Sequence, residues 1–163
     1  MSKSRPRTLI LGLGNPILCD DSAGYRVAMS LKEKLDMPDV DIKEAGIAGL
    51  DLLDMITGYD RAIIIDAIQT EKGKPGRIYR FGPDLLSSTR HSGTPHDVNI
   101  ATALELGKKL KLKLPGEITI FAIEVADVTS FSEECTPGVK KAVHRCVEMV
   151  MRELAGNDRR AQL

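Results

Sequence analysis

The chain has 163 residues, a length that suits one domain with one hydrophobic core. Lysine and arginine number 23, as do aspartate and glutamate, so the formal net charge is zero. This balance argues against a nucleic-acid-binding protein, which usually carries surplus positive charge. No apolar run reaches the roughly 20 residues that span a bilayer, and the first one is too short for a signal peptide. Three cysteines without Cys-x-x-Cys spacing indicate reduced thiols, so we expect a cytoplasmic protein.

Strand and helix patterns alternate along the chain. Strands are predicted over 9–13, 40–47, 62–67, 76–81 and 118–123. Helices are predicted from about Gly24, over 49–56, from Pro95, and from Pro137 to Leu154, followed by a polar tail over 156–163. Because parallel strands are joined by crossover helices, this order predicts a three-layer α/β/α sandwich. Its twisted, mostly parallel sheet has about five strands, with 76–81 as the antiparallel one, in a single domain over 1–155.

The first predicted strand ends in Gly12-Leu13-Gly14-Asn15, and the acid pair Asp20-Asp21 follows before the helix. Loops at the carboxyl ends of parallel strands converge on one crevice in open α/β sheets. An aspartate here can cap the next helix, but capping needs only one. The second carboxylate is therefore a candidate ligand or catalytic group.

Two further residues are candidates for the same crevice. Asp66 ends the apolar run 63–65, and we expect it at the mouth of that strand, because an ionised carboxylate inside the run would be costly. His96 lies in the first turn of its predicted helix, where the helix dipole disfavours the protonated imidazole. His91 competes for this role from a loop, whereas His144 has charged neighbours at helical spacing and is set aside.

Asp21, Asp66 and His96 together form a three-ligand set with an open position, which suits a first-row transition metal. The same three groups could also act as acid and base without a metal. A dinucleotide site is rejected because Ile17 stands where the fingerprint needs its third glycine. The stretch Gly12 to Pro16 also looks like the opening of bacterial peptidyl-tRNA hydrolases, which continue with glycine in place of Ile17.

The chain resembles the hydrogenase maturation endopeptidases, which trim the C-terminus of nickel-iron hydrogenase large subunits. The resemblance covers about Leu9 to Leu154 and keeps the family's motifs in order. These motifs are Gly12-Leu13-Gly14-Asn15 with Leu18 and Asp20-Asp21, then Gly46-Ile47-Ala48-Gly49-Leu50, Ile65-Asp66-Ala67, Pro95-His96 and Thr136-Pro137. Ser22 replaces the glycine that often follows the acid pair; we expect Ser22 to cap the helix and leave Asp21 available.

The resemblance implies that Asp21, Asp66 and His96 contact nickel, and that the nickel arrives in the substrate and is not a permanent cofactor. The implied partner is the large-subunit precursor, from which one cleavage removes a C-terminal extension. The implied enzyme is a cytoplasmic monomer that needs no nucleic acid or membrane. Nickel could polarise the scissile carbonyl, Asp21 or Asp66 could activate water, or the metal contact could serve recognition alone. The alternatives are a peptidyl-tRNA-hydrolase-like esterase and a nickel carrier or sensor without catalysis.

Overall fold

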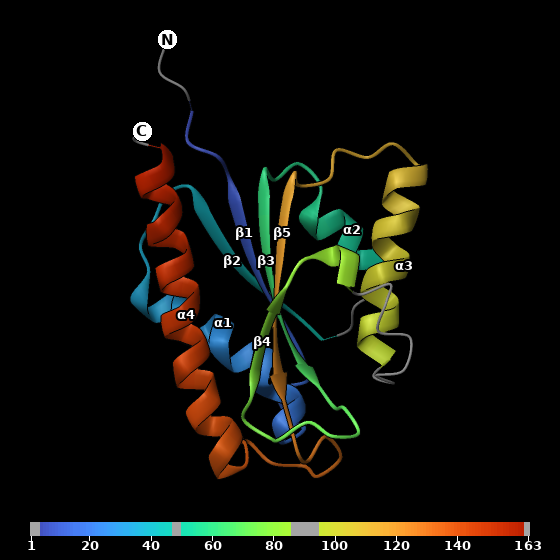
Figure 1. The fold of residues 1–163 in the computed structure, drawn as a ribbon, viewed down its shortest axis with the longest axis vertical. Helices are drawn as coiled ribbons and strands as arrows, with labels where there is room; N and C mark the ends of the chain where they lie inside the picture. The colour runs from blue at the N-terminus through green and yellow to red at the C-terminus, as the bar shows by residue number, and fades with distance from the viewer. Residues whose placement is uncertain (1–3, 47–49, 86–94, 162–163) are drawn as a thin grey trace.

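The computed structural model places a five-stranded sheet between two layers of helices (Figure 1). It describes residues 4–46, 50–85 and 95–161. The elements are β1 (Thr8–Leu13), η1 (Asp20–Ser22), α1 (Ala23–Lys34), β2 (Val40–Ala45), α2 (Leu50–Ile56), β3 (Arg61–Ile68), β4 (Ile78–Phe81), η2 (Pro83–Leu85), α3 (Pro95–Lys109), β5 (Glu117–Glu124) and α4 (Pro137–Ala161). Within these ranges, no helix combines the length and the apolar character that crossing a membrane requires.

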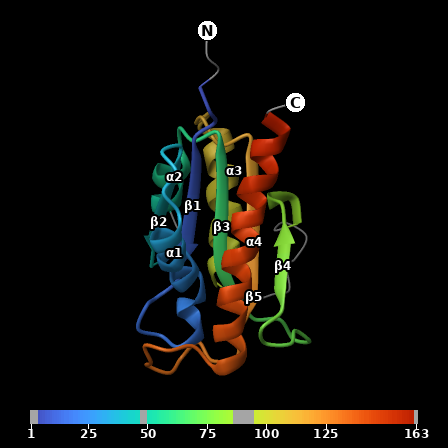
Figure 2. The same ribbon diagram turned by 90° about the vertical axis from the view of Figure 1, so that its left-hand side faces the viewer.

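The strand order in the sheet is β2-β1-β3-β5-β4. β1 pairs in parallel with both β2 and β3, and β3 pairs in parallel with β5. β4 lies at the edge and runs antiparallel to β5, as seen beside α4 in Figure 2. The predicted three-layer architecture with a mostly parallel sheet is therefore confirmed.

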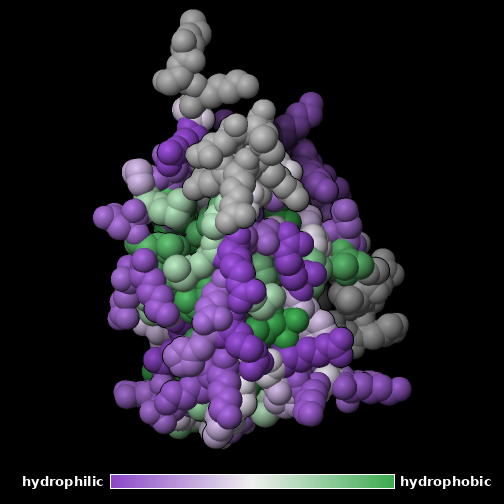
Figure 3. Space-filling model, turned by 60° about the vertical axis from the view of Figure 1, so that its left-hand side comes forward, coloured by the Kyte–Doolittle hydropathy of each residue, from purple (hydrophilic) through white to green (hydrophobic). Residues whose placement is uncertain are grey.

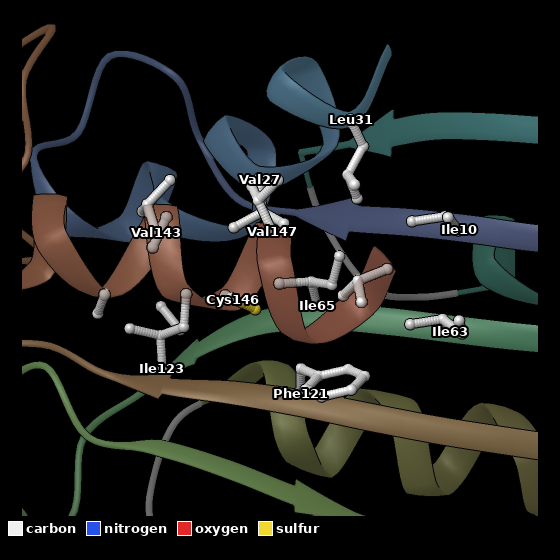
Figure 4. Close-up of a cluster of buried hydrophobic side chains, with 14 of the residues drawn as sticks. Ile10, Val27, Leu31, Ile63, Ile65, Phe121, Ile123, Val143, Cys146 and Val147 are labelled. Atoms are coloured by element: carbon white, nitrogen blue, oxygen red, sulfur yellow. The ribbon is translucent and has the colours of Figure 1, made fainter. Parts of the chain in front are cut away.

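Two hydrophobic cores lie on opposite faces of the sheet. On one face, α1 and α4 pack against the strands, and Val27, Ile65 and Val147 point toward one another (Figure 4). On the other face, α2 and α3 cover a second cluster that includes Leu11 and Ile64. Every residue of β3 is buried because both of its faces are covered, which explains its continuous apolar run.

Helix α4 extends along the sheet from one end of the molecule to the other (Figure 1). On the side that it covers, hydrophilic residues form a column with hydrophobic side chains on either side (Figure 3). The helix continues to Ala161, although the sequence pattern predicts a polar tail from Gly156. A single exposed glycine costs a helix only about 1 kcal/mol, too little to end it. The residues that follow Gly156 are polar as expected, but those through Ala161 are helical.

Candidate active site

The candidate site lies at the carboxyl ends of β1 and β3, where the order of the strands in the sheet changes direction. β1 is flanked by β2 on one side and β3 on the other, and the connecting helices α1 and α2 cover opposite faces. In open α/β sheets, this arrangement leaves a crevice outside the carboxyl ends of the two central strands. The loop after β1 carries Asp20 and Asp21, and the last part of β3 carries Asp66.

Two glycines bring the loop after β1 close to β3. Gly14 has a φ of +144°, and a Cβ atom there would lie 2.1 Å from the carbonyl oxygen of Asp21. A Cβ atom at Gly24 would lie 2.3 Å from the carbonyl oxygens of both Leu13 and Ile65. Because only glycine fits at such separations, the start of α1 packs directly on the two strands. The turn η1, which holds both acids, contacts β3 as a result.

Asp20 is fully buried and is engaged in holding two loops together. Its Oδ2 accepts hydrogen bonds from the backbone amides of Ala126 and Asp127, both at 3.0 Å. Its Oδ1 accepts a hydrogen bond from the Thr136 amide at 2.7 Å, and the Thr136 hydroxyl also donates to this carboxylate. Asp20 therefore links the β1–α1 loop to the β5–α4 loop.

Asp21 lies next to Asp20 but is only half-buried. Within the described part of the chain, its Oδ2 accepts one hydrogen bond, from the Asn15 amide at 3.1 Å. This bond orients the carboxylate and leaves its other oxygen available for a ligand. Asp21 is thus placed where the sequence predicts a functional acid.

Ser22 does not cap helix α1 with its side chain, contrary to the prediction. It occupies the N-cap position with helical backbone angles, because η1 leads directly into α1. Its hydroxyl donates to the carbonyl oxygen of Cys19 at 2.6 Å and accepts from Arg26 Nε at 3.3 Å. The turn η1 leads directly into α1, so no side-chain cap is needed there. The carboxylate of Asp21 therefore does not cap the helix either, and one of its oxygens can still bind a ligand.

Asp66 lies inside strand β3, two residues before its end, and is 1% exposed. Its Oδ1 accepts a hydrogen bond from the Ala67 amide at 2.8 Å. The alternation of β3 places Asp66 on the same face as Ala62 and Ile64, which is the face covered by α2 and α3. The expected position at the mouth of the strand therefore needs correction: β3 continues to Ile68 by pairing with β5 after the pairing with β1 has ended at Ile65.

His96 lies in the first turn of α3, for which the structure describes the backbone but not the side chain. The N-terminal end of α3 is at the same end of the molecule as the carboxyl ends of β1 and β3 (Figure 1). The helix start at Pro95 is confirmed. His91 and residues 47–49 of the glycine-containing motif lie outside the described residues. His144 lies on the exposed side of α4, as expected.

Among residues 4–46, 50–85 and 95–161, the described side chains form no group of three or more metal-binding residues. The described half of the candidate site therefore consists of two carboxylates. One is half-exposed, on the β1–α1 loop, and the other is buried in β3 on the α2 and α3 face. Carboxylates in such positions can bind a metal ion or accept a proton from water.

Comparison with known proteins identifies the family. A family model described as hydrogenase maturation protease matches residues 25–153. The chain belongs to the hydrogenase maturation protease family. It is 27% identical over 150 residues to the hydrogenase 2 maturation protease of Escherichia coli strain K12, covering 91% of this chain and 90% of that protein. It is 36% identical to the hydrogenase expression/formation protein HupD of Rhizobium leguminosarum bv. viciae, covering 91% and 74% of the two chains.

Solved structures of hydrogenase maturation proteases share the fold. The hydrogenase maturating endopeptidase HybD from E. coli is 27% identical, with a TM-score of 0.80 and 93% of each chain covered. HybD from Thermococcus kodakarensis is also 27% identical, with a TM-score of 0.70, covering 90% of this chain and 97% of that one. The protein is thus a member of an endopeptidase family, as the motifs of its sequence indicate.

Sequence reasoning missed the roles of two residues, Asn15 and Glu124, whose hydrogen bonds hold loops that follow the sheet strands. Asn15 holds Asp21 with its backbone amide and Ile17 with its side chain. Glu124, at the end of β5, is 1% exposed and accepts hydrogen bonds from the amide and hydroxyl of Thr70. A glutamate that ends an apolar strand was a detectable signal for Glu124. Asn15 was noticed only as part of the family motif that follows the first strand, without a role of its own.

Proposed function

We propose that this protein removes a C-terminal extension from the nickel-loaded precursor of a nickel-iron hydrogenase large subunit. Its family membership supports a maturation protease, and its relatives are named for hydrogenase maturation. The observation that supports this site is the difference in burial and hydrogen bonding between the adjacent acids Asp20 and Asp21. Asp20 is buried and accepts hydrogen bonds from three backbone amides and the Thr136 hydroxyl, whereas Asp21 keeps a half-exposed carboxylate at the crevice.

We assign contact with the nickel of the substrate to Asp21, Asp66 and His96. Asp21 and Asp66 are supported by their positions after β1 and within the end of β3, the two strands that flank the crevice. His96 is supported by its place in the first turn of α3, on the sheet face to which Asp66 belongs. Two carboxylates and an imidazole are borderline-hard ligands that suit nickel without holding it tightly when the substrate is absent. The ion then belongs to the substrate and leaves with the product.

Asp21 or Asp66 can act as the general base in this reaction. The carboxylate takes a proton from a water molecule, whose oxygen attacks the carbonyl carbon of the scissile peptide. The carbon–nitrogen bond then breaks, and the same proton passes to the departing amine. Nickel bound in the substrate would polarise the carbonyl or fix its position.

We expect the enzyme to act as a single copy in the cytoplasm. All three proposed nickel contacts come from one chain, so the site needs no residue from a second copy. Cys19, Cys135 and Cys146 are free thiols in the structure, as is usual in a reducing compartment.

The test is a cleavage assay with a purified large-subunit precursor in nickel-loaded and nickel-free forms. We expect mass spectrometry to show loss of the C-terminal extension only from the nickel-loaded form. Equal cleavage of both forms would remove nickel from the recognition step, and failure to cleave either would contradict the proposed function. Calorimetric titration of the isolated protein with nickel should give micromolar or weaker binding. Nanomolar binding without cleavage would instead indicate a nickel carrier.

A further inference from the structure

Two large apolar side chains are exposed on the loops beside the candidate site. Phe131, on the β5–α4 loop, is 81% exposed and is the most exposed large apolar residue among those the structure describes. Ile17, on the β1–α1 loop, is 54% exposed. An isolated apolar side chain at a protein surface is unremarkable, but neighbouring ones beside a functional site can mark an interaction surface.

The two loops that carry these side chains are joined through their backbones, and we call the exposed face of the paired loops, with Ile17 and Phe131, the Ile17–Phe131 surface. The two loops lie side by side at the carboxyl end of the sheet (Figures 1 and 2). Leu18 and Phe131 form an antiparallel bridge. The Ser132 amide donates to the carbonyl oxygen of Ile17, and the Cys19 amide donates to that of Ser130, both at 3.0 Å.

The Ile17–Phe131 surface is connected to Asp21 through one residue. The Asn15 side-chain oxygen accepts a hydrogen bond from the Ile17 amide at 3.1 Å. The Asn15 amide donates to Asp21 Oδ2, also at 3.1 Å. A polypeptide that presents its scissile bond to Asp21 therefore lies within reach of Ile17.

The loop that carries Phe131 is ordered before any partner binds. Asp127 Oδ1 accepts hydrogen bonds from the amides of Thr129 and Ser130. The Ser130 side chain, together with these amides, holds the pKa of Asp127 below its usual range. Asp20 holds the start of the same loop through the amides of Ala126 and Asp127. Little conformational entropy remains to be lost on binding, so burial of the Phe131 ring contributes directly to affinity. Aromatic side chains in such positions are frequent centres of binding energy.

We propose that the Ile17–Phe131 surface is a docking surface for the precursor protein, where it takes an apolar patch beside the scissile bond. This inference rests on the proposed function. Two other occupants fit less well. A second copy of this chain bound here would obstruct access to Asp21, and an anionic lipid surface would meet the exposed carboxylates of Glu133 and Glu134.

The test compares Phe131→Ser and Ile17→Ser, singly and together, with Leu110→Ser as the matched control. Leu110 is 59% exposed and directly follows the C-terminal end of α3, at the opposite end of the molecule (Figure 1). We expect the double variant to raise the KM for nickel-loaded precursor by about tenfold, with kcat within about twofold of wild type. The Leu110 variant should keep both constants, and all variants should melt at the wild-type temperature.

An unchanged KM in the double variant would overturn the docking surface even if the wild-type enzyme cleaves the precursor. A fall in kcat at constant KM would also overturn it, because the loops would then act on the reaction and not on binding. Loss of self-association or of binding to anionic vesicles, with unchanged precursor affinity, would identify one of the rejected occupants. If wild type cleaves no precursor, the proposed function fails by itself, and a direct precursor-binding measurement on the same variants then decides the surface separately.

Discussion

The carboxylate of Asp20 and the backbone amide of Thr136 lie 2.7 Å apart, although 116 residues separate them in the chain. This hydrogen bond joins the loop that carries Asp21 to the start of α4. Charge-assisted hydrogen bonds of this kind contribute about 1.5–3 kcal/mol each when they are buried. The position of Asp21 thus depends on the contacts that its neighbour Asp20 makes with a distant loop.

Asp20→Asn should therefore destabilise the protein. The amide has one acceptor oxygen in place of two, and its NH2 group would face backbone N–H donors. We expect the free energy of unfolding to fall by about 1.5–3 kcal/mol in urea titrations. A variant with wild-type stability and no activity would show that Asp20, and not Asp21, is the functional acid.

Asp21→Asn should stop cleavage and leave stability nearly unchanged. The asparagine oxygen can still accept the hydrogen bond from the Asn15 amide, but the negative charge is lost. We expect no processed precursor and a change in unfolding free energy of less than about 1 kcal/mol. Parallel melting curves and cleavage assays on the Asp20 and Asp21 variants measure both effects, and an active Asp21→Asn enzyme would refute the assignment.

His96→Ala should abolish processing without unfolding the protein. A residue in the first turn of a helix need not carry core packing, and alanine is a good helix former. Precursor cleavage and circular dichroism provide the two measurements. His144→Ala, on the exposed side of α4, is the control and should process the precursor normally. His91→Ala should reduce processing less than His96→Ala does. Normal processing by His96→Ala would remove this residue from the site.

Gly24→Ala should destabilise the junction between α1 and the two central strands. The added methyl group would meet the carbonyl oxygens of Leu13 and Ile65 at 2.3 Å, so backbone must move. We expect a loss of about 1–3 kcal/mol, together with loss of cleavage, because the displaced α1 start carries η1 with it. Gly156→Ala is the matched control: in the described part of the chain, no atom beyond its neighbours and its own helix backbone lies within 4 Å of the added Cβ. The α4 helix should gain about 0.5–1 kcal/mol. Thermal melts of the two variants should shift in opposite directions.

The ion pair between Arg80 and Glu153 should make stability depend on acid pH. Arg80 Nε donates to Glu153 Oε2 at 3.0 Å, and this hydrogen bond lowers the pKa of Glu153. A lowered folded-state pKa contributes stability that is complete above the unfolded-state value of about 4.3 and is lost as the pH falls through the folded-state value. Because Arg80 is half-exposed and solvent screens the pair, Glu153→Gln should cost about 1 kcal/mol at pH 7 and progressively less below about pH 4. A difference that stays constant down to pH 2 would contradict this origin.

Hydrophobic periodicity was sufficient to predict the layers, the sheet and most helix starts. The run 62–67 predicted the central strand because both of its faces are buried, and proline at 95 and 137 marked two helix starts correctly. The end of β3 was beyond such reasoning. Its last residues are held by β5, a strand about fifty residues later, so the local pattern around Asp66 does not reveal where pairing stops.

Local sequence patterns also fail to distinguish the two adjacent acids at the candidate site. The sequence presents Asp20 and Asp21 as near equals, and only their donors distinguish them. The backbone amides that donate to Asp20 come from residues 126–136, whereas the amide that donates to Asp21 belongs to Asn15, six residues away. Motif resemblance could favour Asp21 as the functional acid, but only the tertiary contacts show how the surroundings of the two acids differ.

The hydrogen bonds between Asp20 and the β5–α4 loop also have a consequence for folding during synthesis. All five strands leave the ribosome before residues 126–136, so the sheet can begin to form while Asp20 still lacks its donors. The β1–α1 loop, although made first, reaches its final form only after Thr136 has emerged. A nascent chain that stalls before this point holds every strand but lacks the donors that fix Asp20 beside the β5–α4 loop.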